Sequence, residues 1–233
     1  MRGGVENSVD IKSVKEASLE SLKSVLDLID TIDFTVPETY AAWLSQNYFF
    51  VRHSFRLLSL AAAHATLSSD RFSWYTLTNV GAVKSREKLI LRDLTELGYG
   101  IENFIELPST KAFYRCQYYL IQNVNPLSIM GYTLFADGLI VEASKEFTPG
   151  IIRSFPKAAS FVKSFVAGEA SRIDKSFKVI ESVPKSTYPV ILESYHDSAF
   201  FYGNILSLLQ CCLKSTYVAQ AAHSRQSGDR LSF

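Results

Sequence analysis

Apolar residues recur along most of the chain at the three- and four-residue spacing of helices that bury one face. The first such run covers about residues 13–32, and the second begins at Pro37 and continues to about Ala65. Proline suits the first turn of a helix, and the second run is apolar around much of its girth, which is typical of a central helix. The pattern therefore predicts a chain that starts with two helices, the second of them central.

Helical spacing continues through the later chain, with glycine and proline between the runs. The further predicted helices cover residues 72–97, 108–124, 127–147, a short stretch from Ile151, 171–183 and 188–217. Residues 72–97 are predicted to form one long helix that stops at Gly98. The sequence thus predicts an all-α bundle of about seven or eight helices. It forms one domain over residues 13–221, with a flexible N-terminus (1–12) and a polar C-terminal tail (222–233).

Composition agrees with this fold class and limits the partners. Hydrophobic residues make up 47% of the chain, with only 11 Gly and 7 Pro, so it can bury a large core but has few turn residues. The 24 Lys and Arg nearly balance the 23 Asp and Glu, which argues against non-specific nucleic-acid binding. Three cysteines without metal-site spacing favour the cytoplasm, and no apolar run is long enough for a signal peptide or a membrane span.

Two apolar signatures carry a resemblance to a known family. They are Tyr48-Phe-Phe-Val-Arg-His-Ser-Phe-Arg-Leu-Leu58 in the second helix and Glu87 to Gly98 at the end of the third. With the helix order, they make residues 35–210 similar to the heme-oxygenase-like helical superfamily, which includes the TenA and PqqC proteins. Within it the chain most resembles the CADD-like branch, with its related non-heme iron oxidases. The resemblance implies a heme-oxygenase-like fold.

The resemblance also implies positions for iron ligands, and this sequence departs from most of them. Where the family carries a histidine ahead of the Glu87 run, this chain has Arg86. The family's glutamate in the fifth helix matches Glu142. In the last helix its His-x-x-x-Asp-x-x-His pattern falls on Glu193, Asp197 and Phe200, so only Asp197 is kept. Because a guanidinium stays protonated and repels a metal ion, these replacements argue against a di-iron centre.

The same replacements suggest what stands in the metal's place. If the family's geometry holds, Arg86 lies among Glu142, Glu193 and Asp197 and compensates buried carboxylates. His53, on the second helix, is a further candidate for the pocket wall. We therefore expect a central pocket without a metal or other cofactor, which binds a small apolar or amphipathic molecule or serves regulation.

Other interpretations stay open at this stage. Residual catalysis through Arg86 and the acids would follow the family's thiaminase-like and cofactor-independent relatives. The main alternative is a non-heme iron oxygenase, an oxidoreductase whose ligands come from Glu142, Asp197, His53 or His196, with Glu87 or Asp93. A third is a helical protein-interaction module. A homodimer is compatible with the surplus of apolar residues.

Overall fold

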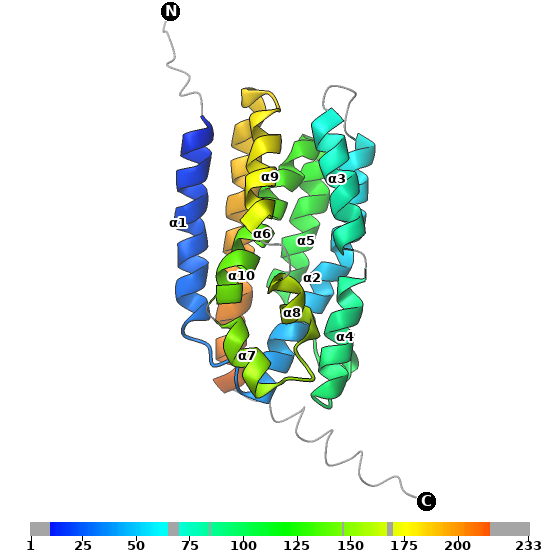
Figure 1. Ribbon diagram of the computed structural model, residues 1–233, viewed down its shortest axis with the longest axis vertical. Helices are drawn as coiled ribbons and strands as arrows, with labels where there is room; N and C mark the ends of the chain where they lie inside the picture. The colour runs from blue at the N-terminus through cyan, green and yellow to red at the C-terminus, as the bar shows by residue number, and fades with distance from the viewer. Residues whose placement is uncertain (1–9, 65–69, 84, 146, 167–169, 215–233) are drawn as a thin grey trace, which may run out of the picture.

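The computed structural model describes residues 10–64, 70–83, 85–145, 147–166 and 170–214. Within these ranges the chain forms ten α-helices and no strand, which confirms the all-α fold class. Most helices run along the long axis of the molecule (Figure 1). The predicted C-terminal tail and most of the predicted N-terminal segment lie outside the described residues. None of the described helices combines the length and the apolar character needed to cross a bilayer.

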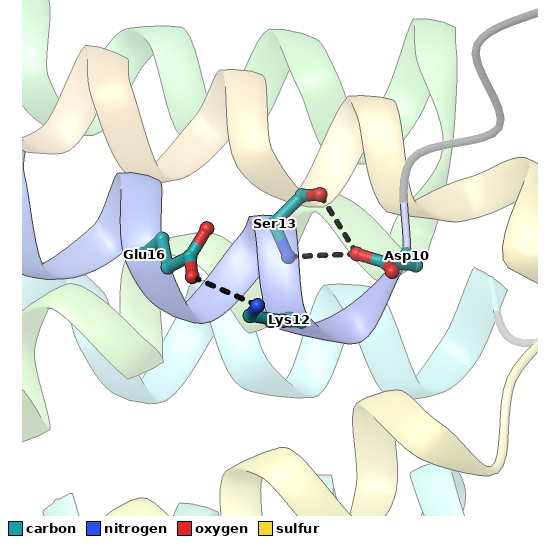
Figure 2. Close-up of polar contacts among 4 residues, drawn as sticks. All are labelled: Asp10, Lys12, Ser13 and Glu16. Atoms are coloured by element: carbon teal, nitrogen blue, oxygen red, sulfur yellow. Dashed lines mark hydrogen bonds and ion pairs between the residues drawn. The ribbon is translucent and has the colours of Figure 1, made fainter.

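Helix α1 (Ile11–Ile29) begins at a side-chain cap that the sequence pattern did not reveal. The Asp10 carboxylate accepts hydrogen bonds from the Ser13 amide, at 2.8 Å, and from the Ser13 hydroxyl, at 2.7 Å (Figure 2). One turn further, Lys12 and Glu16 pair at 3.7 Å. Because a helix leaves its first amides without partners, the cap fixes the start of α1 two residues before the predicted one.

Two long helices form the centre of the bundle, α2 (Pro37–His64) and α10 (Tyr188–Lys214). Helix α10 packs against α1, α5 (Pro108–Tyr119) and α6 (Ile129–Lys145). Helix α2 packs against α5, α3 (Asp70–Val83) and α4 (Arg86–Glu96). The predicted bounds of α2 are confirmed to within a residue or two. The central position expected from its apolar girth is confirmed as well.

The predicted long third helix is wrong, because the chain turns within it. Helix α3 (Asp70–Val83) ends and α4 (Arg86–Glu96) begins again after Ser85, whose φ of 72° lies in the left-handed region. The two helices follow one another along one edge of the molecule (Figure 1). The helix ends here because the segment contains three weak helix formers, Asn79, Gly81 and Ser85. The break makes Arg86 the first residue of a new helix.

In the described ranges ten α-helices replace the expected seven or eight, because residues 72–97 form two helices and a further helix follows the short one that was predicted from Ile151. The remaining elements are short. They are α7 (Thr148–Ser154), α8 (Ser160–Val166), α9 (Ala170–Glu181), a π-helical turn at Leu120–Val124, and 3₁₀ turns at Ile101–Asn103, Pro126–Ser128 and Lys185–Thr187. Pro156, expected to mark a kink or a new start, lies in the connection between α7 and α8.

Buried polar side chains from one helix hold the start of another. Gln46 of α2 accepts hydrogen bonds from the Leu107 amide (3.1 Å) and the Thr110 hydroxyl (2.7 Å), and donates to the Ile105 carbonyl (3.0 Å). These groups surround the first turn of α5, whose own capping residue makes no side-chain hydrogen bond. In the same way, Asp93 of α4 accepts from the amides of Ser160 and Phe161 at the start of α8, at 2.9 and 2.7 Å.

Helices α6 and α10 approach each other so closely that only glycine fits at Gly131. A Cβ atom there would lie 2.1 Å from the Ile191 carbonyl oxygen and 2.6 Å from the Tyr195 nitrogen, both main-chain atoms of α10. Main-chain atoms cannot rotate away as side chains do. The crossing therefore depends on the missing side chain, and it sets the position of α6 against the rest of the core.

Candidate functional site

A cavity of about 90 Å³ is lined by residues of α2, α3, α4, α5, α6, α8 and α10. Most of its wall is aromatic or aliphatic, including Trp43, Phe113, Phe135 and Phe161. Polar side chains reach it at only a few points, from Asn47, Ser54, Asn79, Arg86, Tyr132, Thr133, Asp137 and Tyr202. An apolar cavity with a few convergent polar groups is the usual form of a small-molecule site.

The first polar group on the wall is formed by Arg86, Tyr132 and Ser54. The Ser54 and Tyr132 hydroxyls are both buried and lie 2.9 Å apart in a hydrogen bond. Burial raises the pKa of the Tyr132 hydroxyl, while the Ser54 hydrogen bond and the nearby charge of Arg86 act in the opposite direction. Tyr132 thus stays a neutral phenol at physiological pH, next to a permanent cation on the cavity wall.

The second polar group is the carboxylate of Asp137, which was not among the site residues predicted from the sequence. The Ser176 hydroxyl of α9 donates to Asp137 Oδ2 at 3.5 Å, and Ser176 is itself hydrogen-bonded to the Tyr75 hydroxyl of α3 at 2.9 Å. Asp137 is the only charged residue of α6 before Glu142. That isolated acid in an apolar stretch was the signal that could have identified it.

Tyr202 supplies the third polar contact, where α10 meets α2. The Trp43 indole N–H donates to the Tyr202 hydroxyl at 2.9 Å. Burial raises the pKa of Tyr202 to about 12, against the opposing effect of its hydrogen bonds with Trp43 and Asn47. The ring of Tyr202 packs edge-on against Phe50 and Phe135, so this part of the wall is held rigidly.

Arg86 and the three carboxylates that were expected around it do not share the lining of this cavity. Arg86 lines the cavity, but Glu142, Glu193 and Asp197 do not. Glu142 pairs instead with Lys145 at 2.8 Å on the outside of α6. Asp197 accepts a hydrogen bond from Cys116 Sγ of α5 at 3.3 Å, and Glu193 is exposed. The expected convergence of these acids on Arg86 is therefore not found at this cavity.

Helical phase accounts for the position of Asp197 and only partly for that of Glu142. Each residue advances the helix by about 100°. On α6, Glu142 is about 120° from Ala136 but only about 20° from Phe135, and both of these line the cavity, so Glu142 lies at the edge of the lining face. On α10, Asp197 and the wall residue Tyr202 are five positions apart, and so about 140° apart. Alignment by sequence motif could not resolve these angles, because no motif in this chain fixes the phase.

His53, the fifth expected pocket residue, also lies outside the cavity wall, between α2 and α5. Its ring stacks on Tyr114 with centroids 3.9 Å apart, and its Nδ1 lies 3.2 Å from the Tyr118 hydroxyl. Burial, followed by the charges of Arg52 and Arg56, lowers the pKa of His53 to about 4. It is therefore a neutral, stacked ring at physiological pH.

The residues considered for an alternative iron site are also dispersed. The Asp93 carboxylate is fully buried and accepts hydrogen bonds from the first two amides of α8. His196 Nδ1 lies 2.8 Å from the Ser21 hydroxyl on an exposed part of the α1–α10 contact. Within the described ranges, no three His, Cys, Asp or Glu side chains lie close enough to hold a metal ion together. The donor set that the family resemblance implies does not fit an iron site in this arrangement.

Among the comparisons with known proteins, only the comparison of structures identifies the fold. No protein-family model matches the chain, and no curated protein matches it. Several solved structures match, among them three that match over most of their length.

The first is a domain of unknown function with a heme oxygenase-like fold from Shewanella denitrificans. It has a TM-score of 0.66 and 16% identity, covering 97% of this chain and 99% of that one. A TenA homologue from Pseudomonas syringae has a TM-score of 0.69 and 9% identity, with coverage of 90% and 98%. A TenA homologue from Pyrococcus furiosus has a TM-score of 0.62 and 16% identity, with coverage of 85% and 97%. The chain therefore has the heme-oxygenase-like fold, as its helix order and apolar signatures predicted.

Proposed function

We propose that the chain binds a small, partly apolar molecule in the central cavity and that it does so without a metal ion. The observation that supports this most directly is the cavity itself, with about 90 Å³ of space inside an apolar wall. On a similar scale, one water needs about 10–15 Å³ and an engineered cavity of about 150 Å³ admits benzene. The proposed ligand is therefore compact, of the order of a single ring or smaller.

The polar groups on the wall define the rest of the ligand. Arg86 provides a cation and Asp137 an anion, and both lie on the same cavity. A group that accepts hydrogen bonds is suited to the side of Arg86 and Tyr132, because the guanidinium carries only donors. A ligand with one such group and an apolar body matches both parts of the wall.

The proposal that no metal ion is bound rests on the residues that stand at the expected ligand positions. Arg86 occupies the position where the family resemblance places a histidine ligand, and a guanidinium offers no lone pair to a metal. The two acids that match family ligand positions, Glu142 and Asp197, have other partners away from the cavity. We propose that the fold here retains the cavity and uses it for binding or regulation.

A binding experiment tests the first part. A library of compounds of about five to ten heavy atoms is screened by ligand-observed NMR against the wild type, Ala136→Leu and Arg153→Met. Ala136 lines the cavity, so the larger leucine fills it, whereas Arg153 is exposed on α7 and serves as the matched control. We expect hits whose affinity falls by at least about tenfold in Ala136→Leu and is unchanged in Arg153→Met. Urea unfolding verifies that both variants are folded. Hits that bind Ala136→Leu as well as the wild type would refute the proposal.

Elemental analysis tests the metal-free part. The protein is expressed in iron- and manganese-supplemented medium, alongside Glu142→Ala. We expect well below stoichiometric iron and manganese in both proteins. Near-stoichiometric iron in the wild type that is lost in Glu142→Ala would contradict the proposal and favour a non-heme iron oxygenase.

A further inference from the structure

A second cavity, of about 180 Å³, lies outside the central one, between α1, α6, α9 and α10. All four helices contribute apolar side chains to its wall, which are Leu19, Leu22, Leu134, Ile173, Phe177 and Tyr195. It shares no lining residue with the central cavity. The two spaces are therefore separate sites on the molecule.

The space exists because α1 and α9 both pack against α6 without filling the region between them. On the floor, Gly138 of α6 contributes no side chain, and a Cβ atom there would come within 3.2 Å of Leu22 Cδ2. At the mouth, the Leu19 side chain lines the cavity while it is 68% exposed to solvent. A large apolar side chain left in water next to an apolar cavity gains free energy when a ligand covers it.

Two polar groups of α1 lie at this apolar cavity, and they differ in character. The Ser18 hydroxyl is buried, since the residue is 5% exposed, and it finds no hydrogen-bond partner among the described residues. The Lys15 ammonium, three residues earlier on the same helix, lies 4.9 Å from the centre of the Phe177 ring and 3.6 Å from Glu181 Oε1. Residues three apart on a helix are neighbours on its surface, so one small group can reach both.

We propose that this cavity is a second ligand site, for a compact hydrophobic carboxylic acid. The apolar body occupies the space over Gly138 and beneath Leu19. The carboxylate accepts a hydrogen bond from the Ser18 hydroxyl and pairs with the Lys15 ammonium. Its volume of about 180 Å³ accommodates a single aromatic ring, since about 150 Å³ suffices for benzene. Glu181 competes with the ligand for Lys15, so the protein's own acid holds the cation in place when the site is empty.

Three probes of nearly the same shape separate the contribution of the carboxylate from that of the ring. Benzoate, benzyl alcohol and benzylamine are titrated by NMR into the wild type, Lys15→Met, Glu181→Gln and Lys12→Met. Lys12 is the control because it is exposed on the same helix and pairs with an acid, Glu16, as Lys15 does. We expect wild-type affinity in the order benzoate, benzyl alcohol, benzylamine, with a benzoate Kd of about 1 mM or tighter.

The variants then report on the charge. Lys15→Met is expected to weaken benzoate by about 5- to 10-fold and to leave benzyl alcohol unchanged, because only the anion loses a partner. Glu181→Gln is expected to strengthen benzoate by about 2- to 5-fold, because the competing acid is gone. Lys12→Met should bind all three probes as the wild type does. Equal affinity for the three probes, or an equal effect of Lys12→Met and Lys15→Met, would overturn the proposal.

The location is read from intermolecular NOEs between the ring protons of benzoate and protein methyl groups. Contacts with Leu22, Leu134 and Ile173 place the probe in the proposed site. Contacts with Val51 or Ile140 instead would assign benzoate to the central cavity and refute the second site. Failure to saturate by about 20 mM benzoate would refute it as well. Because these contacts distinguish the two cavities, failure of the second site and failure of the central one can be told apart.

Discussion

Replacing Asp93 is the most informative perturbation of the fold, because one buried carboxylate holds a short helix that forms part of the cavity wall. Asp93 is fully buried, and its two oxygens accept separately from the Ser160 and Phe161 amides. Helix α8 has only seven residues, and so short a helix does not form by itself in water. We infer that Asp93 stabilises α8 by satisfying its first two amides and its positive helix end.

The magnitude follows from these two hydrogen bonds. A hydrogen bond to a charged group contributes about 1.5–3 kcal/mol, and a buried donor left without a partner costs about 1–3 kcal/mol. Asp93→Ala leaves two such donors, so we expect the free energy of unfolding to fall by about 3–5 kcal/mol. Asp93→Asn keeps one acceptor oxygen but turns an NH₂ group towards the second amide. We expect it to lose about 2 kcal/mol.

Urea denaturation followed by circular dichroism measures both values, and Glu96→Gln is the control because Glu96 is an exposed acid on the same helix. Its free energy of unfolding should stay within about 0.5 kcal/mol of the wild type. Hydrogen exchange gives a local readout, since the Ser160 and Phe161 amides should lose protection in Asp93→Ala before the rest of the core does. A loss below about 1 kcal/mol with unchanged protection of these amides would refute the reasoning.

Three further predictions concern single contacts. Gly131→Ala should cost at least about 3 kcal/mol or prevent folding, because the new Cβ meets main-chain atoms of α10, whereas Gly203→Ala, with its nearest neighbour at 3.5 Å, should be mild by the same urea assay. The His53 pKa is lowered from 6.5 to about 4, so the unfolded state binds the proton more readily. The free energy of unfolding should therefore fall as the pH drops from about 6.5 towards 4, as measured by urea midpoints at several pH values. In His53→Phe, which keeps the stacked ring, the midpoints should change less over this pH range. Asp10→Ala should lower the melting temperature slightly, and Asp10→Asn, which can still cap, should restore most of it in differential scanning calorimetry.

Helical periodicity predicted the fold class and most helix bounds because these depend on which residues are buried. The break after Val83 was not predicted for the same reason. Val83 and Ile90 are seven positions apart, so the apolar face continues across the break as if the helix were unbroken. The turn depends on the backbone of Ser85, and serine adopts many conformations. A pattern of burial contains no information about a single left-handed residue.

The cavity was harder to predict than the fold because its chemistry depends on helical phase and on contacts between distant residues. Arg86 was singled out from a family motif, and the structure does place it on the wall. The acids chosen with it do not line the cavity and have other partners or are exposed, and Asp137, which does line it, matches no motif. Its hydrogen bond with Ser176 links positions 39 residues apart, and local spacing cannot reveal such a pair.

Two classes of polar side chains inside the bundle have different consequences for the cavity. Gln46 and Asp93 direct their side chains at main-chain groups of another helix, and their hydrogen-bonding capacity is used to hold α5 and α8. Tyr132, Asp137 and Tyr202 direct theirs at a shared cavity. The first class holds apolar parts of the cavity wall, since α5 and α8 carry Phe113 and Phe161, whereas the second class lies on α6 and α10. If the cavity binds a ligand as proposed, substitutions in the second class would alter ligand choice, whereas a substitution in the first alters the wall together with the stability of the protein.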